Sequence, residues 1–339
     1  MVTMQDVARR AGVTKQTVSN VVTGRVGVRP DTAARVRVAI DELGYVPNLV
    51  ARSLATGSTR TVGLFVPTVG TAFYAALVEE VEDALDEHGH HLLLCTTRRS
   101  GDRARRHLAG LTSRSVDALL VAGDQDLLDH LPLLSGARFP VALCAWETDA
   151  PEGFPVVTVD YEKGGLLAGR HLRDLGHEHV VVLASPAHAR RVEGFKRAFT
   201  EQGDAEVGGD RVHFVHESSF RAAFDAARTA LDAHPEVTAL FATHDVLASG
   251  ALEAAQAAGR SVPDDLSVVA YDDCPAGPSS RPALTSVVLP RRQMARNAVT
   301  LLLDAAGGRE PSVRHRMLPP ELVVRDSSGP AARRSADVR

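Results

Sequence analysis

Apolar residues in the first 45 positions recur at spacings of three and four, the period of an amphipathic helix. They predict three short helices whose apolar faces are formed by Val7, Ala8 and Ala11, by Val18, Val21 and Val22, and by Ala34, Val38 and Leu43. Gly12 separates the first two helices, Thr14 offers an oxygen that caps the second, and Gly44 ends the third. Two short helices joined by a tight turn and braced by a third are typical of a helix-turn-helix DNA reader.

From Thr61 onward, short apolar runs alternate with amphipathic segments. The runs TVGLFVP, HLLLC, VDALLVAG and PVALCAW show no strand-period alternation, as expected of parallel strands buried on both faces. Segments such as AFYAALVEEVEDALDEHG predict helices between them, and the alternation repeats after Asp160. The pattern predicts two doubly wound α/β lobes, at about residues 61–159 with 290–318 and at about 160–289. We expect a ligand between the lobes, at the carboxyl ends of the strands.

Length and composition are those of a soluble protein with two or three domains. The chain has 339 residues, of which 44% are hydrophobic and 24% charged. It shows neither the apolar core of a signal peptide nor an apolar run of about eighteen residues, so we expect a cytoplasmic protein without membrane contact. Its three cysteines lie far apart and lack metal-ligand spacing, so we expect buried thiols.

Charge separates the start of the chain from the rest. Residues 1–60 contain nine Lys or Arg against four acidic residues, whereas the remainder contains 29 against 38. A basic head on an acidic protein favours phosphate binding by the head. The alternative is a solvated three-helix bundle that binds no nucleic acid.

Five sequence blocks resemble the lactose-repressor (LacI/GalR) family of bacterial transcription regulators. In order they are DVARRAGVTKQTVSNVV, LGYVPNLVARSLATGSTRTVGLFVP, VVAYDD, RPALTSV and LPPELVVRDSS, so the resemblance spans residues 3–328. It implies an α/β protein with a three-helix helix-turn-helix head (1–46), a hinge helix and linker (47–60), and a two-lobed clamshell of doubly wound parallel sheets (61–328). This clamshell is like that of periplasmic binding proteins and is expected to bind the effector and to dimerise. We expect residues 329–339 to form a disordered tail.

The linker is expected to change state on DNA. One or two helical turns between Pro47 and Gly57 are too short to be stable alone, so they are expected to order on DNA against the hinge of a second subunit. The resemblance implies that Leu54 wedges into the minor groove; the alternative is a flexible tether whose leucine packs on the core. The predicted DNA contacts are Thr14, Lys15, Gln16, Thr17, Ser19, Asn20, Asn48, Arg52 and Leu54.

No catalytic set, phosphate loop or metal-ligand spacing occurs in the sequence, so we predict neither an enzyme nor a bound cofactor or metal. Polar residues do follow apolar strands, among them Arg191, His244 and Asp272. A guanidinium and carboxylates suit hydroxyl-rich ligands such as sugars. Arg191 and Asp272 also match effector-contacting positions of the family, although each could instead form a salt bridge or a cap.

Departures from the family pattern suggest an unusual ligand. His244 stands where Asn is common, so a group that titrates near neutrality is expected there. Ala145 and Trp146 replace a common Asp-Arg pair. Phe73 and Tyr74 could stack on a sugar ring or pack in the core at a helix start. The predicted effector contacts are Phe73, Tyr74, Trp146, Arg191, Phe220, His244 and Asp272.

These observations predict a dimeric transcription repressor of the bacterial cytoplasm, located at the nucleoid when bound. Its partners would be a near-palindromic double-stranded operator, a sugar or related metabolite, and a second copy of the chain. Effector binding would move the lobes and change the spacing of the two hinges. Two alternatives stay open: a regulator that needs a purine-like co-repressor, and a solute-binding or enzyme domain with a fortuitous helix-turn-helix.

Overall fold

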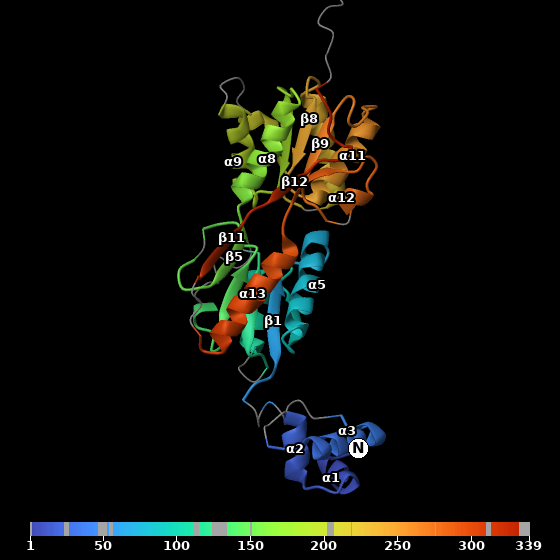
Figure 1. Ribbon diagram of the computed structural model, residues 1–339. Helices are drawn as coiled ribbons and strands as arrows, with labels where there is room; N and C mark the ends of the chain where they lie inside the picture. The colour runs from blue at the N-terminus through green and yellow to red at the C-terminus, as the bar shows by residue number, and fades with distance from the viewer. Residues whose placement is uncertain are drawn as a thin grey trace, which may run out of the picture.

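The chain forms a helical head followed by two α/β lobes, as the computed structural model in Figure 1 shows. The structure describes residues 2–23, 27–46, 53, 57–111, 115–123, 134–149, 151–201, 207–217, 219–274, 276–309 and 313–331.

The head consists of α1 (Met4–Ala11), α2 (Lys15–Thr23) and α3 (Pro30–Leu43). Gly12 and Gly44 end α1 and α3 in the left-handed conformation, at φ 65° and 59°, as predicted. The backbone N–H of Thr17 donates to Oγ1 of Thr14 at 3.1 Å, so the predicted cap of α2 is present. Of the predicted face of α3, Leu43 packs against the core, but Ala34 and Val38 are exposed and the helix buries Val36 and Ala39 instead.

Lobe 1 is a six-stranded parallel sheet in the order β11-β5-β4-β3-β1-β2. Its strands are β1 (Thr61–Val66), β2 (His91–Thr96), β3 (Ala118–Ala122), β4 (Val141–Cys144), β5 (Val156–Val159) and β11 (His315–Leu318). Its helices are α5 (Ala72–Asp86), α6 (Gly101–Gly110) and α13 (Arg291–Ala306), and α5 and α13 lie side by side (Figure 1). The four predicted apolar runs all form strands, but HLLLC is not buried as expected, because β2 lies at the edge of the sheet and Leu93 and Leu94 are each 38% exposed.

Lobe 2 repeats this architecture with the strand order β12-β10-β9-β8-β6-β7. Its strands are β6 (Val180–Ala184), β7 (Val212–Phe214), β8 (Ala239–Ala242), β9 (Ser267–Asp272), β10 (Thr285–Val288) and β12 (Glu321–Val323). Its helices are α8 (Tyr161–Asp174), α9 (Ala189–Thr200), η2 (Gly209–Arg211), α10 (Phe220–Ala233), α11 (Asp245–Ala257) and α12 (Ala276–Ser279). Only β12 runs antiparallel to its neighbour among the described strands.

The chain crosses between the lobes three times: between β5 and α8, between β10 and α13, and between β11 and β12. The last crossing returns the C-terminal segment to lobe 2, where the N–H of Gly329 donates to Oγ of Ser267 at 3.0 Å. The N–H of Ala331 donates to the carbonyl of Leu175 at 2.8 Å. Residues 329–331 of the expected tail are therefore attached to the fold, and residues 332–339 lie outside the described residues.

Candidate functional sites in the head and between the lobes

The exposed face of α2 carries the polar residues predicted to contact DNA. Thr14, Lys15 and Gln16 are exposed, whereas Val18 is fully buried against α1 and α3. Nε2 of Gln16 donates to Oδ1 of Asn20 at 3.0 Å, so two amides are held together one turn apart. Thr17, Ser19 and Asn20 are half-buried, and Asn48, Arg52 and Leu54 lie outside the described residues.

Beyond the hinge, the chain is fastened to lobe 1 by Asp117, which directly precedes β3. Its carboxylate accepts hydrogen bonds from the backbone N–H groups of Thr59 and Arg60, at 2.7 and 2.8 Å, and from the Ser58 hydroxyl at 2.6 Å. Burial raises the pKa of Asp117, but these hydrogen bonds outweigh it and the pKa is lowered. The junction between the linker and the first strand is thus set by one carboxylate.

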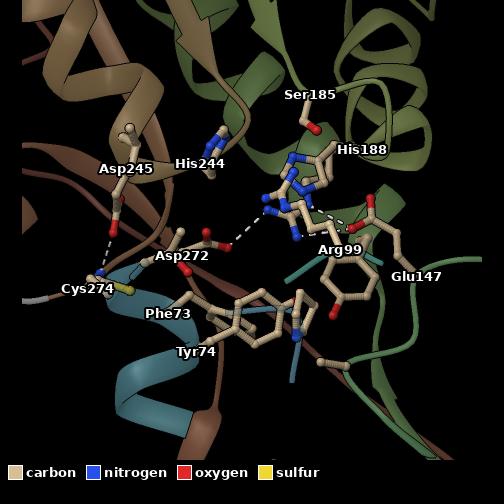
Figure 2. Close-up of a pocket in the computed structure, with 17 residues that line it drawn as sticks. Phe73, Tyr74, Arg99, Glu147, Ser185, His188, His244, Asp245, Asp272 and Cys274 are labelled. Atoms are coloured by element: carbon tan, nitrogen blue, oxygen red, sulfur yellow. Dashed lines mark hydrogen bonds and ion pairs between the residues drawn. The ribbon is translucent and has the colours of Figure 1, made fainter. Parts of the chain in front are cut away.

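A pocket lies between the lobes at the carboxyl ends of the strands, where the sequence analysis placed the ligand. It measures about 820 Å³, including space open to solvent. Figure 2 shows Phe73 and Tyr74 from the first turn of α5 on one side and the polar residues of lobe 2 on the other. Five predicted effector residues line it: Phe73, Tyr74, Arg191, His244 and Asp272.

Arg191, in the first turn of α9, is the centre of a buried ion network. Its guanidinium contacts Oε2 of Glu147, from lobe 1, and Oδ1 of Asp272, each at 3.0 Å. Nη1 also donates to the carbonyl of Thr243 at 2.7 Å. The guanidinium carbon lies 4.9 Å and 4.3 Å from the ring centroids of Tyr161 and Tyr271. Burial lowers the pKa of Arg191, but the carboxylates outweigh it and the pKa is raised, so this arginine stays charged.

Asp272 ends β9 with φ at 89°, in a backbone region that residues other than glycine rarely adopt. The strain is supported from α13, where Nη1 of Arg291 donates to the Asp272 carbonyl at 2.5 Å. Burial raises the pKa of the Asp272 carboxyl, and the neighbouring Arg191 opposes that rise. The carboxylate is therefore held in one orientation towards the pocket.

His244 does not titrate near neutrality, contrary to the sequence-based prediction. Burial, together with the positive charges of Arg191 and Arg99, lowers its pKa to about 3. The ring lies edge-on to His188 at a centroid distance of 5.3 Å, and burial and Arg191 hold the pKa of His188 well below its ordinary value. Both imidazoles are neutral at pH 7, so each has one nitrogen that donates and one that accepts.

Asp245, which follows His244 after β8, also lines the pocket, although it was not among the predicted effector contacts. Its Oδ2 accepts from the backbone N–H of Cys274 at 2.6 Å, while Oδ1 has no hydrogen-bond partner among the described residues. Burial and the neighbouring Asp272 carboxylate raise its pKa to about 7. Near neutral pH the Asp245 carboxyl is therefore protonated, and able to donate, in some molecules and ionised, and able only to accept, in the others.

Two predicted effector residues do not line the pocket. Trp146 is 1% exposed and packs in a lobe 1 core cluster with Phe65 and Phe154. The chain turns at Ala145, whose φ is 53°, and Ala145 and Glu147, the neighbours of Trp146, face the pocket instead. Phe220 begins α10 and is 51% exposed, since it precedes the turns whose alanines pack on the core of lobe 2.

The lining residues that the sequence analysis did not choose include Arg99, Glu147, Tyr161, Ser185, His188, Asp245 and Cys274. Most of them follow a strand or begin a helix, which is the signal that selected His244. Among the described residues, no group of three His, Cys, Asp or Glu side chains is placed to hold a metal ion.

Comparisons with known proteins cover both the head and the two lobes. Residues 3–48 match the bacterial regulatory proteins of the lacI family, and residues 170–328 match the periplasmic binding protein-like domain. Catabolite control protein A of Priestia megaterium is 33% identical over 311 residues, 89% of this chain and 91% of that protein. The HTH-type transcriptional repressor PurR of Photobacterium profundum is 33% identical over 339 residues, 96% of this chain and 98% of that protein.

The chain belongs to the lacI family. Among solved structures, the CelR–cellobiose complex, a transcriptional regulator, is 32% identical with a TM-score of 0.71, over 96% of this chain and 100% of that one. The Lac repressor dimer bound to operator and the anti-inducer ONPF is 25% identical with a TM-score of 0.83, over 97% and 99%.

As a member of the lacI family, the protein is a DNA-binding transcription regulator under small-molecule control. Its relatives are transcription regulators and not enzymes. No helix within the described part of the chain has the length and apolar character needed to cross a bilayer.

Proposed function

We propose that this lacI-family protein is a dimeric repressor of the bacterial cytoplasm whose release from a near-palindromic operator is triggered by a neutral, hydroxyl-rich molecule, most simply a sugar. Residues 1–46 read the operator, residues 47–60 form the hinge with Asn48, Arg52 and Leu54 at the DNA, and residues 61–328 bind the effector and the second subunit. Two solved relatives support the effector class, the dimer and the operator, since one structure holds cellobiose and the other is a dimer bound to its operator.

The observation that carries the effector class is the balance of polar groups in the pocket. Arg99 and Arg191 face the carboxyl groups of Glu147, Asp272 and the partly protonated Asp245, so the lining is close to neutral. A charged ligand would upset this balance in a partly buried site. Buried lining atoms without a hydrogen-bond partner among the described residues include Thr71 Oγ1, His244 Nδ1 and Nε2, and Asp245 Oδ1. Alternating donors and acceptors of this kind suit hydroxyl groups.

The aromatic wall is compatible with a second ligand class. Phe73 and Tyr74 lie edge-to-face at a centroid distance of 5.1 Å, line the pocket and also pack on the core. A ring face could stack on a purine as well as on the apolar face of a sugar. A purine would act as co-repressor and strengthen operator binding, so the sign of the response separates the two.

The test is retardation of a fragment of the protein's own promoter region, with and without cellobiose, glucose, hypoxanthine and guanine. We expect a sugar to release the fragment and to raise the melting temperature of the free protein, because a ligand at 100 times its Kd stabilises by about 2.7 kcal/mol.

Asp272→Asn should abolish the response and keep operator binding. Gln16→Ala should do the opposite, weakening operator binding by roughly 1–3 kcal/mol while keeping the thermal shift. Retention strengthened by a purine alone would contradict the proposal.

A further inference from the structure

Two acidic residues of one short lobe 1 segment pair with two consecutive arginines of lobe 2. Glu147 contacts Arg191 at 3.0 Å, and Asp149 contacts Arg190 at 2.5 Å. Both acids follow β4, and both arginines belong to the first turn of α9. The two pairs differ in burial: the Glu147 and Arg191 side chains are each 6% exposed, whereas Asp149 is 99% exposed. Only the buried pair is protected from water and salt, so it is the stronger restraint between the lobes.

The two edges of the Arg191 guanidinium have different partners. Nη1 is held inside lobe 2, by the Thr243 carbonyl at 2.7 Å and by Asp272 at 3.0 Å. The other edge, formed by Nε and Nη2, faces Oε2 of Glu147, with both nitrogens at 3.0 Å. This is the edge that forks onto a carboxylate or a pair of hydroxyls. A ligand that takes hydrogen bonds from it must displace Glu147.

Replacing Glu147 by ligand hydroxyls costs less free energy than breaking the Glu147–Arg191 pair without a replacement. Arg191 is buried between the rings of Tyr161 and Tyr271, and a buried charge that loses its partner is strongly destabilising. Ligand hydroxyls that accept from Nε and Nη2 replace the lost partner on Arg191. Glu147 lies in the segment after β4 and can turn to solvent when the lobes separate. Effector binding at this edge and the bond between the lobes are therefore mutually exclusive.

We propose that Glu147 is a latch: in the effector-free protein it occupies the Nε–Nη2 edge of Arg191 and joins the two lobes, and the effector acts by replacing it. The identity of the competing ligand rests on the proposed function, but the bond between the lobes does not. The latch links the pocket to the lobe movement, because the group that the ligand displaces is the one that holds the lobes together.

The first experiment titrates the full-length protein and its Glu147→Gln variant with cellobiose and the rest of the panel. Gln keeps the shape of Glu and loses its charge, so competition for Arg191 weakens. We expect effector affinity to rise at least tenfold and operator affinity without effector to fall towards that of the effector-saturated wild type. Asp149→Asn is the matched control, from which we expect changes of less than twofold. Lower effector affinity in Glu147→Gln would show that Glu147 binds the effector itself and would overturn the latch, as would equal effects of the two variants.

The second experiment needs no ligand. It therefore tests the latch even if the wild type binds no compound of the panel, a result that would contradict only the proposed effector class. Spin labels are placed at Asp83, exposed on α5, and at Asp264, exposed in lobe 2, after the half-buried Cys95 is replaced by Ser. We expect a longer and broader distance distribution in Glu147→Gln, an intermediate one in Glu147→Asp, whose shorter side chain keeps the charge, and the wild-type distribution in Asp149→Asn. Glu147→Asp also provides the measurement if Glu147→Gln does not fold. An unchanged distance in either Glu147 variant would overturn the latch.

Discussion

The residues of the pocket show how burial changes the chemistry of a side chain. His244 stands at a position where the family commonly has an amide, and the sequence suggested a group able to titrate at physiological pH. In the fold, burial and two neighbouring guanidinium groups keep the imidazole neutral, with a pKa of about 3. Like an amide, it therefore offers both a donor group and an acceptor group, here on a ring.

Because folded His244 stays neutral, the stability of the protein should decrease in acid. In the unfolded chain His244 titrates at about 6.5, so between pH 6.5 and 3 the unfolded state binds a proton that the folded state does not. Stability is thus present above pH 6.5 and lost as the pH falls. Between pH 7.5 and 5 the free energy of unfolding of the wild type should fall by about 2 kcal/mol more than that of His244→Asn. Urea unfolding of both proteins at the two pH values measures this difference, and parallel losses would contradict the assigned pKa.

At the scale of elements, two glycines set the position of α9 and hence of Arg191. A Cβ on Gly194 would lie 1.8 Å from the carbonyl oxygen of Glu162 in α8, and one on Gly165 would lie 1.9 Å from the carbonyl oxygen of Arg191. Backbone therefore packs on backbone at this crossing, and a methyl group on either side must push the helices apart.

Gly194→Ala should move the first turn of α9 out of register with Glu147 and Asp272. We expect a loss of about 1–3 kcal/mol of stability from overpacking and effector binding weakened at least tenfold. Gly110→Ala is the control, since a Cβ on Gly110 at the end of α6 meets nothing within 4 Å. Denaturation and calorimetric titration report the two effects; equal behaviour of the two variants would mean that α9 can shift without cost.

At the scale of the whole molecule, charge separates the DNA-binding head from an acidic body. We expect the logarithm of operator affinity to fall with the logarithm of salt concentration by about 0.9 per neutralised phosphate. Residues 61–339, with 29 basic and 38 acidic residues, should not bind duplex DNA detectably. Fluorescence anisotropy from low to high salt measures both; a fragment that binds like the full chain would invalidate the division into head and body.

Local features of this protein follow from its sequence, because their causes lie within a few residues. The left-handed caps at Gly12 and Gly44 and the Thr14 cap of α2 needed no knowledge of the tertiary fold. Apolar runs such as TVGLFVP predicted buried strands for the same reason. The short strands β7, β11 and β12 contain polar residues and carry no comparable signal, since they form only where an existing sheet offers a partner.

Arg191, His244 and Asp272 could be predicted as neighbours because each follows a strand, and parallel strands end at one edge of a sheet. Glu147 could not be predicted, because its pairing with Arg191 depends on contact with the opposite lobe and on the backbone angle φ of Ala145. Ala145 has φ at 53°, and this turn sends Glu147 into the pocket and Trp146 into the core, the reverse of the sequence-based expectation. The sequence by itself thus determined the family, the glycine and threonine caps in the head, the main strands and five of the 17 residues that line the pocket. Only the tertiary structure decided which side chains meet across the cleft, because those contacts join residues more than forty positions apart.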